Sequence, residues 1–318
     1  MSLAMRIVSL LPSATEILFA LGLDSEIVGV SHECDFPPAA RTKTVVIHSR
    51  LPLDAPPAVI DRLVREYASR GESLYAVDTD ILEALQPDLI ITQDLCHVCA
   101  ASPEDLATVL AGFHHRPDVL CLNPQDLGDV WRDILLVGEA TCRGPQAEVL
   151  LEEIGERLGK LEEQLDGSVP QPRVAFFEWL EPIYVGGHWI PEMIRSAGGE
   201  DVLGTVRTPS FRIHLQEVVE AAPDILLMAP CGYTAEQSRN EYLSIELPEQ
   251  WNVMPAVRNS RVYALNANSY FSRPGPRLIT GIEILAKVFQ PSLSVSPEAE
   301  LAILPIPSDT AATRAASV

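Results

Sequence analysis

The sequence predicts an α/β protein made of two doubly wound parallel-sheet lobes joined by one long helix. Within residues 144–166, apolar side chains recur at steps of three and four on a helix otherwise coated with charged and amide side chains. These are Leu151, Ile154, Leu158, Leu161 and Leu165. The segments before and after this helix also repeat one plan of strands and helices. As one element, the helix spans about 23 residues and about 35 Å, the height of a small domain.

The two halves repeat three units in the same order. Each half begins with a β-branched run, continues to a helix end with a Pro-Asp turn and an apolar strand, and closes with a short strand before its last helix. The paired segments are 6–10 and 173–177, 81–92 and 218–228, and 119–123 and 262–266. Apolar strands alternating with helices favour parallel sheets covered on both faces. Because ligands of such sheets bind beyond the carboxyl ends of the strands, we expect a ligand cleft between the lobes.

Residues that begin and end the long helix set the predicted domain boundaries. Gly144 and Pro145 open it, and the run 167–170 closes it. The predicted domains are an amino-terminal α/β lobe at 1–142, the connecting helix at 143–168, a carboxyl-terminal α/β lobe at 169–290, and a tail rich in Pro, Ser and Ala at 291–318.

Composition excludes several classes of protein. A net charge of −21 and a pI near 4.6 argue against nucleic-acid binding, because phosphate contacts need clustered Lys and Arg. No run approaches the ~18 apolar residues of a membrane span. The amino terminus lacks the pattern of a secretory leader, so the chain as written is expected in the cytosol. Six cysteines are too few for a disulfide scaffold in 318 residues.

The first strand is expected at residues 6–11, where Pro12 ends it. Ser13 and Glu16 are predicted to form a capping box at the start of the helix that Gly22 ends. The loop 9–13 follows the carboxyl end of this strand. It is therefore a candidate for ligand contact through its backbone amides.

The second strand is expected at residues 27–31, and His32, Glu33, Cys34 and Asp35 follow it. Neighbours in an extended segment point to opposite faces, so at most two of these side chains converge. A structural or ligand-lining role is therefore favoured over a metal site.

The Pro-rich start of 49–71 and its apolar helical spacing indicate an inserted helix that packs outside the lobe or rims the cleft.

A Cys-x-x-Cys pattern follows the strand expected at 88–92. Cys96 and Cys99 flank His97 and are the sharpest chemical signal in the chain. A single pair supports a soft-metal or redox site only weakly, and a pair that stabilises its loop stays an open alternative.

Two acids stand in the first turns of predicted helices. Glu104 follows the first helical position, Pro103, and Glu217 opens the helix that leads to Pro223. Acids suit the positive end of a helix dipole. Their placement on matching elements of the two halves is what suggests a further role.

The second half carries most of the aromatic side chains. Tyr184, Phe211, Tyr270 and Phe271 fall in or beside loops after strands and are predicted to form flat walls of the cleft. Arg273 precedes the last helix, as a surface residue or as a donor to amide or carboxylate groups of a ligand.

The chain resembles the periplasmic binding proteins of ABC importers for cobalamin and ferric siderophores, and the cobalamin-binding members most. The resemblance spans about residues 5–290. The segments that carry it are 6–18, 28–31, 34–37, 85–91, Gly198 with Gly199, and 273–277. The chain departs from the family in showing no leader, in the extra segment 49–71 and in its Cys-x-x-Cys loop.

The resemblance implies a class III periplasmic-binding-protein-like fold, in which a helical hinge lets the lobes open and close little. It also implies that one acid on each lobe forms salt bridges with arginines of the permease, here Glu104 and Glu217. The family's ligand contacts map onto the loop 9–13, Tyr184, Phe211, Tyr270 and Arg273.

The leading hypothesis is a monomeric, non-enzymatic binding protein that encloses cobalamin or another metal-chelate, such as haem or a ferric siderophore, and hands it to an ABC permease without a cofactor. The predicted ligand-binding residues are Ser9, Pro12, Ser13, His32, Tyr184, Phe211, Tyr270, Phe271 and Arg273. The alternative is a cytosolic metal or redox protein that uses Cys96, His97 and Cys99. A hydrolase is weaker, because no Ser, His and acid set has a known spacing.

Overall fold

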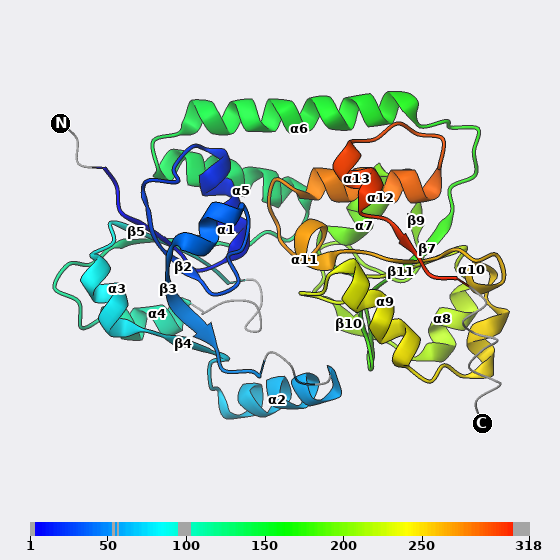
Figure 1. Cartoon of the computed structure of the whole chain (residues 1–318), viewed down its shortest axis with the longest axis horizontal. Coiled ribbons are helices and arrows are strands. Elements are labelled where there is room, and N and C mark those ends of the chain that lie inside the picture. Colours follow the sequence, from blue (N-terminus) through cyan, green and yellow to red (C-terminus); the bar gives the residue numbers. More distant parts are fainter. Residues whose placement is uncertain (1–3, 53–54, 56, 95–102, 308–318) are drawn as a thin grey trace. The chain divides into compact units, whose positions relative to one another are not determined.

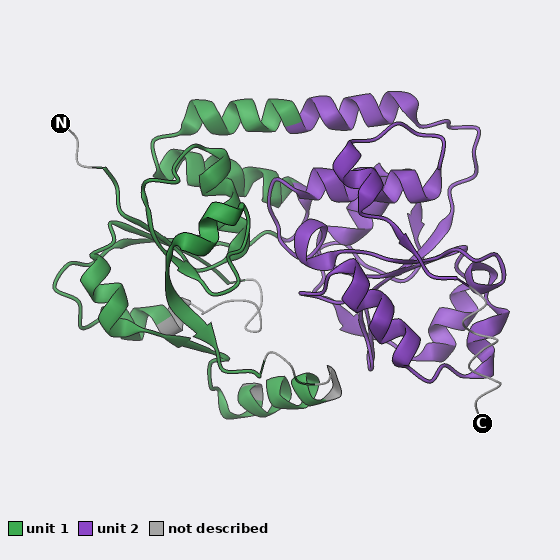
Figure 2. Cartoon of the chain, in the orientation of Figure 1, with its two compact units in different colours: residues 1–124, 128–153 green, residues 125–127, 154–318 purple. Residues whose placement is uncertain are grey.

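A computed structural model describes residues 4–52, 55, 57–94 and 103–307. The chain divides into two compact units, which Figure 2 colours separately. Unit 1 comprises residues 1–124 and 128–153, and unit 2 comprises residues 125–127 and 154–318. Each unit is built on one sheet with a parallel centre, which confirms the predicted fold class.

Unit 1 contains a six-stranded sheet in the order β4-β3-β2-β1-β5-β6 (Figure 1). Its strands are β1 (Ile7–Ser9), β2 (Ile27–Ser31), β3 (Thr44–Ser49), β4 (Tyr75–Val77), β5 (Leu89–Gln93) and β6 (Asp118–Leu122). Its helices are α1 (Pro12–Ala20), η1 (Pro38–Thr42), α2 (Pro57–Arg70), α3 (Thr79–Leu85), α4 (Pro103–Leu110) and α5 (Leu127–Ala140). Strand β4 runs antiparallel to β3, and the other neighbours are parallel. From β1 the chain moves outward to β4 and then returns to β5 on the other side of β1, so β1 and β5 flank a switch point.

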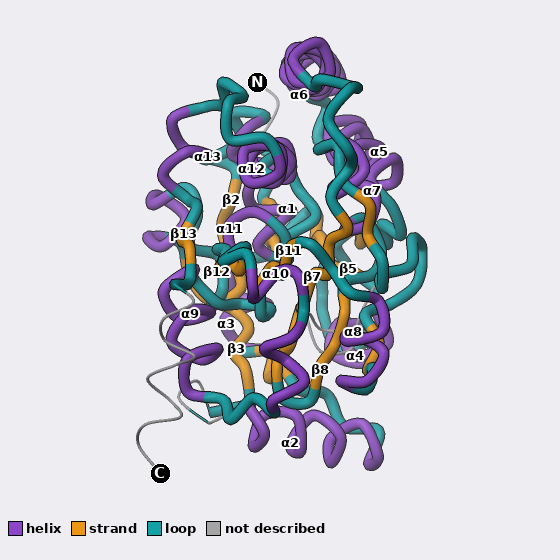
Figure 3. Tube along the Cα trace, turned by 90° about the vertical axis from the view of Figure 1, so that its right-hand side faces the viewer, coloured by secondary structure: helices purple, strands orange, loops and turns teal. Residues whose placement is uncertain are grey.

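Unit 2 follows a related plan, with the sheet order β10-β8-β7-β11-β12-β13 and β9 paired to β7. Its strands are β7 (Arg173–Leu180), β8 (Ile183–Val185), β9 (Glu200–Asp201), β10 (Phe211–Arg212), β11 (Ile225–Met228), β12 (Val262–Ala264) and β13 (Leu304–Pro305). Its helices are α7 (Ile190–Ser196), α8 (Leu215–Ala221), α9 (Ala235–Ser244), η2 (Glu249–Val253), α10 (Pro255–Arg258), α11 (Ala267–Tyr270), α12 (Leu278–Phe289) and α13 (Pro297–Leu301). Figure 3 shows the strands at the centre with helices to either side.

The repeat read from the sequence matches the strand order, because β1, β5 and β6 of unit 1 take the places of β7, β11 and β12 in unit 2. The two sheets are mixed rather than wholly parallel. Strands β8, β10 and β13 pair antiparallel at the edges of the second sheet. Residues 304–305 lie in this sheet, within the segment expected as a tail.

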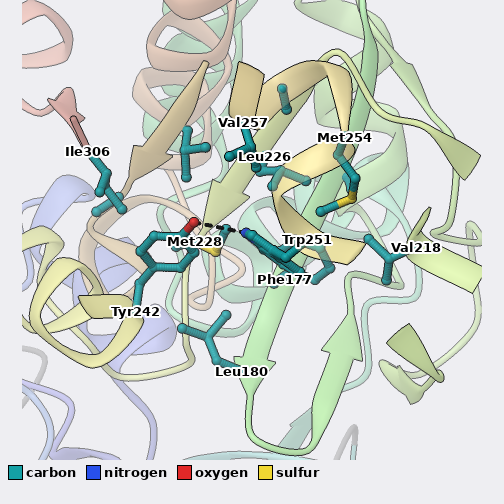
Figure 4. Close-up of a cluster of buried hydrophobic side chains, with 14 of the residues drawn as sticks. Phe177, Leu180, Val218, Leu226, Met228, Tyr242, Trp251, Met254, Val257 and Ile306 are labelled. Carbon is teal, nitrogen blue, oxygen red and sulfur yellow. Dashed lines mark hydrogen bonds between the residues drawn. The ribbon is translucent and has the colours of Figure 1, made fainter. Parts of the chain in front are cut away.

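Aromatic side chains fill part of the core of unit 2 (Figure 4). The ring centroids of Phe177 and Trp251 lie 6.0 Å apart. The indole Nε1 of Trp251 donates a hydrogen bond to the hydroxyl of Tyr242 at 2.9 Å. This bond satisfies the indole N–H, which allows Trp251 to be buried without an unpaired polar atom.

Helix α6 (Gly144–Gln164) is continuous, and its residues are divided between the two units. In unit 1, Ala147 packs against Gly138 of α5, where a Cβ would lie 2.6 Å from that of Ala147. In unit 2, Arg157 makes two hydrogen bonds to the carboxylate of Glu283 on α12, at 2.9 and 2.8 Å. Specific contacts in each unit, besides the apolar side chains that predicted the helix, therefore hold α6 in place.

Glycine-to-alanine changes at two helical positions should act in opposite directions. In Gly281→Ala, the added Cβ would lie 2.3 Å from the carbonyl oxygen of Tyr270 and 2.7 Å from Met193 Cε. We expect this overpacking to lower the free energy of unfolding by about 2 kcal/mol. At exposed Gly155 nothing lies within 4 Å of the added Cβ, so alanine there should raise it by about 0.5–1 kcal/mol. Urea denaturation measures both, and shifts of the same sign would contradict the packing argument.

Candidate functional site

The loop after β1 lies at the switch point of unit 1, but its Ser9 side chain is used within the fold. Ser9 is fully buried, its Oγ donates to the carbonyl oxygen of Leu11 at 3.0 Å, and Thr15 Oγ1 lies 2.8 Å away. This internal network holds the end of β1 against the first turn of α1. The loop is therefore positioned for contact through its backbone rather than through Ser9.

The predicted capping box at Ser13 is wrong. Helix α1 begins at Pro12, and its N-cap is Leu11, whose side chain makes no capping bond among the described residues. Proline's fixed φ suits the first helical position, which moves the start one residue ahead of Ser13. Amides in the first turn of a helix have no intrahelical acceptor, and this turn follows the carboxyl end of β1, so its backbone is a candidate for ligand contact.

His32 follows β2 at the same edge of the sheet. Its Nδ1 lies 3.2 Å from the carbonyl oxygen of Ile47, and the rings of His48 and Tyr75 are each 6.2 Å from its ring. Its Nε2 is buried and has no hydrogen-bond partner in the described part of the chain. Burial lowers the pKa of His32, and His48 acts in the same direction. His32 is thus a neutral imidazole near neutral pH, and the described residues leave one of its ring nitrogens unpaired.

Cys96, His97 and Cys99 lie outside the described residues. Within the described ranges, no three His, Cys, Asp or Glu side chains are grouped to hold a metal ion. The four cysteines that the structure describes, Cys34, Cys121, Cys142 and Cys231, are free thiols. Of these, Cys34 is buried, with its Sγ 3.0 Å from Thr15 Oγ1.

Two of the predicted aromatic residues of unit 2 lie on the strands that extend its sheet beyond β7. Tyr184 of β8 pairs with Arg212 of β10, and Phe211 pairs with Val185. The Tyr184 and Phe211 side chains are half-buried. Phe211 packs partly against the core, so both rings are held in place while still offering surface to a ligand.

Tyr270, Phe271 and Arg273 are more deeply placed, at 9%, 1% and 8% exposure. The Tyr270 hydroxyl donates to Glu298 Oε1 at 2.9 Å. The Phe271 ring lies 5.4 Å from that of Phe176, and its carbonyl oxygen accepts from the indole of Trp189 at 2.8 Å. These contacts give Tyr270 and Phe271 a packing role in unit 2.

The two candidate docking acids do not lie on matching helices. Glu104 is the second residue of α4, between β5 and β6, whereas Glu217 is the third residue of α8, just before β11. Because β11 takes the place of β5, the counterpart of α8 is α3 rather than α4. Glu217 is exposed, and its Oε2 accepts a hydrogen bond from the backbone N–H of His214 at 2.8 Å.

Sequence reasoning missed a cluster at the switch point of unit 2. Trp179 at the end of β7 meets Tyr233, in the loop after β11, with ring centroids 5.8 Å apart. Glu241 of α9 belongs to the same cluster, because Tyr233 and Glu241 each shift the pKa of the other. The available signal was that Trp179 ends one apolar strand and the loop of Tyr233 follows another, and that these two strands are neighbours in the sheet.

Comparison with known proteins places these features in context. Residues 7–268 match the family model described as periplasmic binding protein. A vitamin B12-binding protein of Vibrio parahaemolyticus is 23% identical over 290 residues, which are 90% of this chain and 89% of that protein. An uncharacterized ABC transporter substrate-binding lipoprotein of Bacillus subtilis is 25% identical over 293 residues, 90% of this chain and 80% of that protein.

A solved structure shares the fold. A periplasmic heme-binding protein from Pseudomonas aeruginosa has a TM-score of 0.69 and 19% identity, and the match covers 95% of this chain and 98% of that one. This likeness supports the two-unit α/β architecture. None of the helices in the described ranges is long and apolar enough to cross a membrane.

Proposed function

The chain belongs to the periplasmic binding protein family, and from that membership we propose that it captures a corrinoid or another metal-chelate for delivery to an ABC importer. The observation that carries this proposal is a family match that runs through both α/β units, from 7 to 268. The ligand class comes from similar proteins named for vitamin B12 and heme. We propose that the protein acts by binding alone, without catalysis, and the metal or redox alternative is not favoured.

We propose that residues at the carboxyl edges of both sheets contact the ligand. Unit 1 supplies His32 and the backbone around Pro12 and Ser13, and unit 2 supplies the half-buried rings of Tyr184 and Phe211. Aromatic surface suits a flat macrocycle, whose apolar faces gain most from burial. Arg273 is proposed as a donor to the ligand rim, and Ser9, Tyr270 and Phe271 hold these residues in place.

We propose Glu104 and Glu217 as docking acids for basic residues of a permease. The support is the exposure of Glu217 at the start of α8 and the family's association with ABC importers. With this partner, the protein acts as a monomer in the periplasm or at the cell envelope.

Incubation with cyanocobalamin or haemin should give a coloured complex of one ligand per chain after gel filtration. Tyr184→Ala should weaken binding about tenfold, because it removes about 1.4 kcal/mol of ring contact. Leu301→Ala is the control, since Leu301 is 88% exposed on α13. If neither ligand co-elutes and neither quenches tryptophan fluorescence at micromolar concentration, the proposal is wrong.

A further inference from the structure

Two loops of unit 2 continue the strands that carry Tyr184 and Phe211. Strands β8 and β10 pair antiparallel at these residues. Beyond both strands the pairing keeps the same register, because the backbone N–H of His188 donates to the carbonyl oxygen of Thr208 at 2.8 Å. We call this two-stranded ribbon, residues 183–188 and 207–213, the aromatic ribbon.

The end of the aromatic ribbon beyond the strands is closely packed and strained. Gly187 lies so near the opposite segment that an added Cβ would stand 2.0 Å from the carbonyl oxygen of Thr208. His188 and Arg207 both have positive φ, at 46° and 60°. Residues other than glycine keep such a conformation only where surrounding contacts enforce it. Contacts at this end therefore fix its backbone.

A short segment from the middle of the chain supplies contacts at this end. Residues 125–127 belong to unit 2, although residues of unit 1 flank them on both sides. The Asp126 carboxylate pairs with the Arg207 guanidinium, 81 positions away in the sequence. The backbone N–H of Leu127 donates to Glu192 Oε2 at 2.9 Å, and Glu192 lies in the first turn of α7. The segment therefore joins one chain of the ribbon to the helix that follows the other chain.

These contacts are partly shielded from water. The side chains of Asp126 and Glu192 are 19% and 21% exposed, and Leu127 is 8% exposed. The Arg207 side chain is 57% exposed, so its ion pair adds little to the stability of the whole fold. Its effect on the ribbon is larger, because β10 has only two residues and regular pairing alone holds the two rings weakly.

Taking the proposed function as premise, we propose that Arg207, with Asp126 and Glu192, positions Tyr184 and Phe211 for ligand binding. These three residues act through the aromatic ribbon rather than by contact with the ligand. A site whose side chains are already ordered binds more tightly, because less conformational entropy is lost on binding. Without the contacts of 125–127, the two rings must be ordered by the ligand itself, which weakens binding.

A double-mutant cycle tests this role on the whole chain, titrated with cyanocobalamin and with haemin. Arg207→Ala should weaken binding of the macrocycle about fivefold, whereas Arg207→Lys, which keeps the charge, should bind like the native protein. In a chain that already carries Tyr184→Ala and Phe211→Ala, the change of Arg207 to Ala should have no further effect, because the rings that it positions are gone.

The control is Arg132→Ala. It breaks the pair with Asp129 within helix α5, in which the side chains are similarly exposed, at 65% and 14%. This change should leave binding unaltered. Near-ultraviolet circular dichroism checks that each variant is folded.

Hydrogen exchange measured by mass spectrometry tests the ribbon without any ligand. Arg207→Ala should speed exchange of the backbone amides of the aromatic ribbon at least about threefold, and Arg132→Ala should not. Unchanged exchange, native affinity in Arg207→Ala, or an equal loss of affinity in the chain without the two rings would overturn the positioning role. Absence of binding of both macrocycles to the native chain would instead overturn the proposed function and this role with it, while the exchange result reports separately on the ribbon.

Discussion

Replacing Asp133 by Asn should raise the free energy of unfolding by about 3–4 kcal/mol at pH 8 and by little near pH 4. Asp133 lies on α5 and is only 5% exposed. Burial raises its pKa from 3.8 to about 7; the charge of Asp129 acts in the same direction and Arg132 in the opposite one. Above that pKa the folded protein must hold a buried carboxylate, whereas Asn has nearly the same shape and no charge.

The sign of the pH dependence follows from proton binding. Well below pH 4 the carboxyl group is protonated in both states, so it contributes no difference. Between the unfolded and folded pKa values, the folded state keeps the proton and the unfolded state releases it, so native stability falls as pH rises. Urea denaturation at pH 5 and pH 8 measures this change. Asp118→Asn on exposed β6 is the control, and an equal gain at both pH values in Asp133→Asn would contradict the burial argument.

Replacing Arg157 by Ala should lower the free energy of unfolding by about 3 kcal/mol. The Arg157 guanidinium makes a two-bond pair with Glu283, whose side chain is 9% exposed, and also donates to Thr280 Oγ1 at 3.1 Å. Ser296 Oγ adds a hydrogen bond to the same carboxylate. Truncation therefore leaves a largely buried carboxylate without its counter-charge. The resulting loss of stability is larger than the loss from breaking an exposed ion pair.

Two comparisons isolate this effect by urea denaturation. Lys160→Ala removes the pair with Glu156, whose side chains are 70% and 71% exposed, and should change stability by less than about 0.5 kcal/mol. The double variant Arg157→Met with Glu283→Leu should recover part of the loss, because it removes both charges. A loss in Arg157→Ala no larger than that in Lys160→Ala would show that the pair is not effectively buried.

Local patterns predicted the long elements closely. Helix α6 ends at Gln164, only two residues before the expected end. The prediction came this close because the apolar period of the helix and the glycine and proline residues that mark its ends lie within the segment itself. Strand β2 has the predicted bounds for the same reason. Edge strands such as β10 and β13 were missed, since two residues carry no period and their pairing depends on distant partners.

The sequence indicated which residue types would line the candidate site, but not which of their side chains would be exposed. Tyr184 and Tyr270 look alike in sequence, yet Tyr184 stays half-exposed on β8 while Tyr270 is covered through its bond to Glu298. Burial of this kind is decided by packing between elements far apart in the chain. The Trp179, Tyr233 and Glu241 cluster escaped for the same reason, because its members come from three elements that only the sheet topology brings together.

The last described strand bears on how the protein avoids self-association. Strand β13 lies antiparallel on β12, with Leu304 opposite Ala264 and Pro305 opposite Tyr263. It thereby covers backbone N–H and C=O groups of β12 with which a strand from another molecule could otherwise form hydrogen bonds. Proline has no backbone N–H, so Pro305 leaves the outer rim one donor short and discourages growth of the sheet by further chains. Shortening the protein ahead of residue 304 would strip away this cover and expose a template for aggregation.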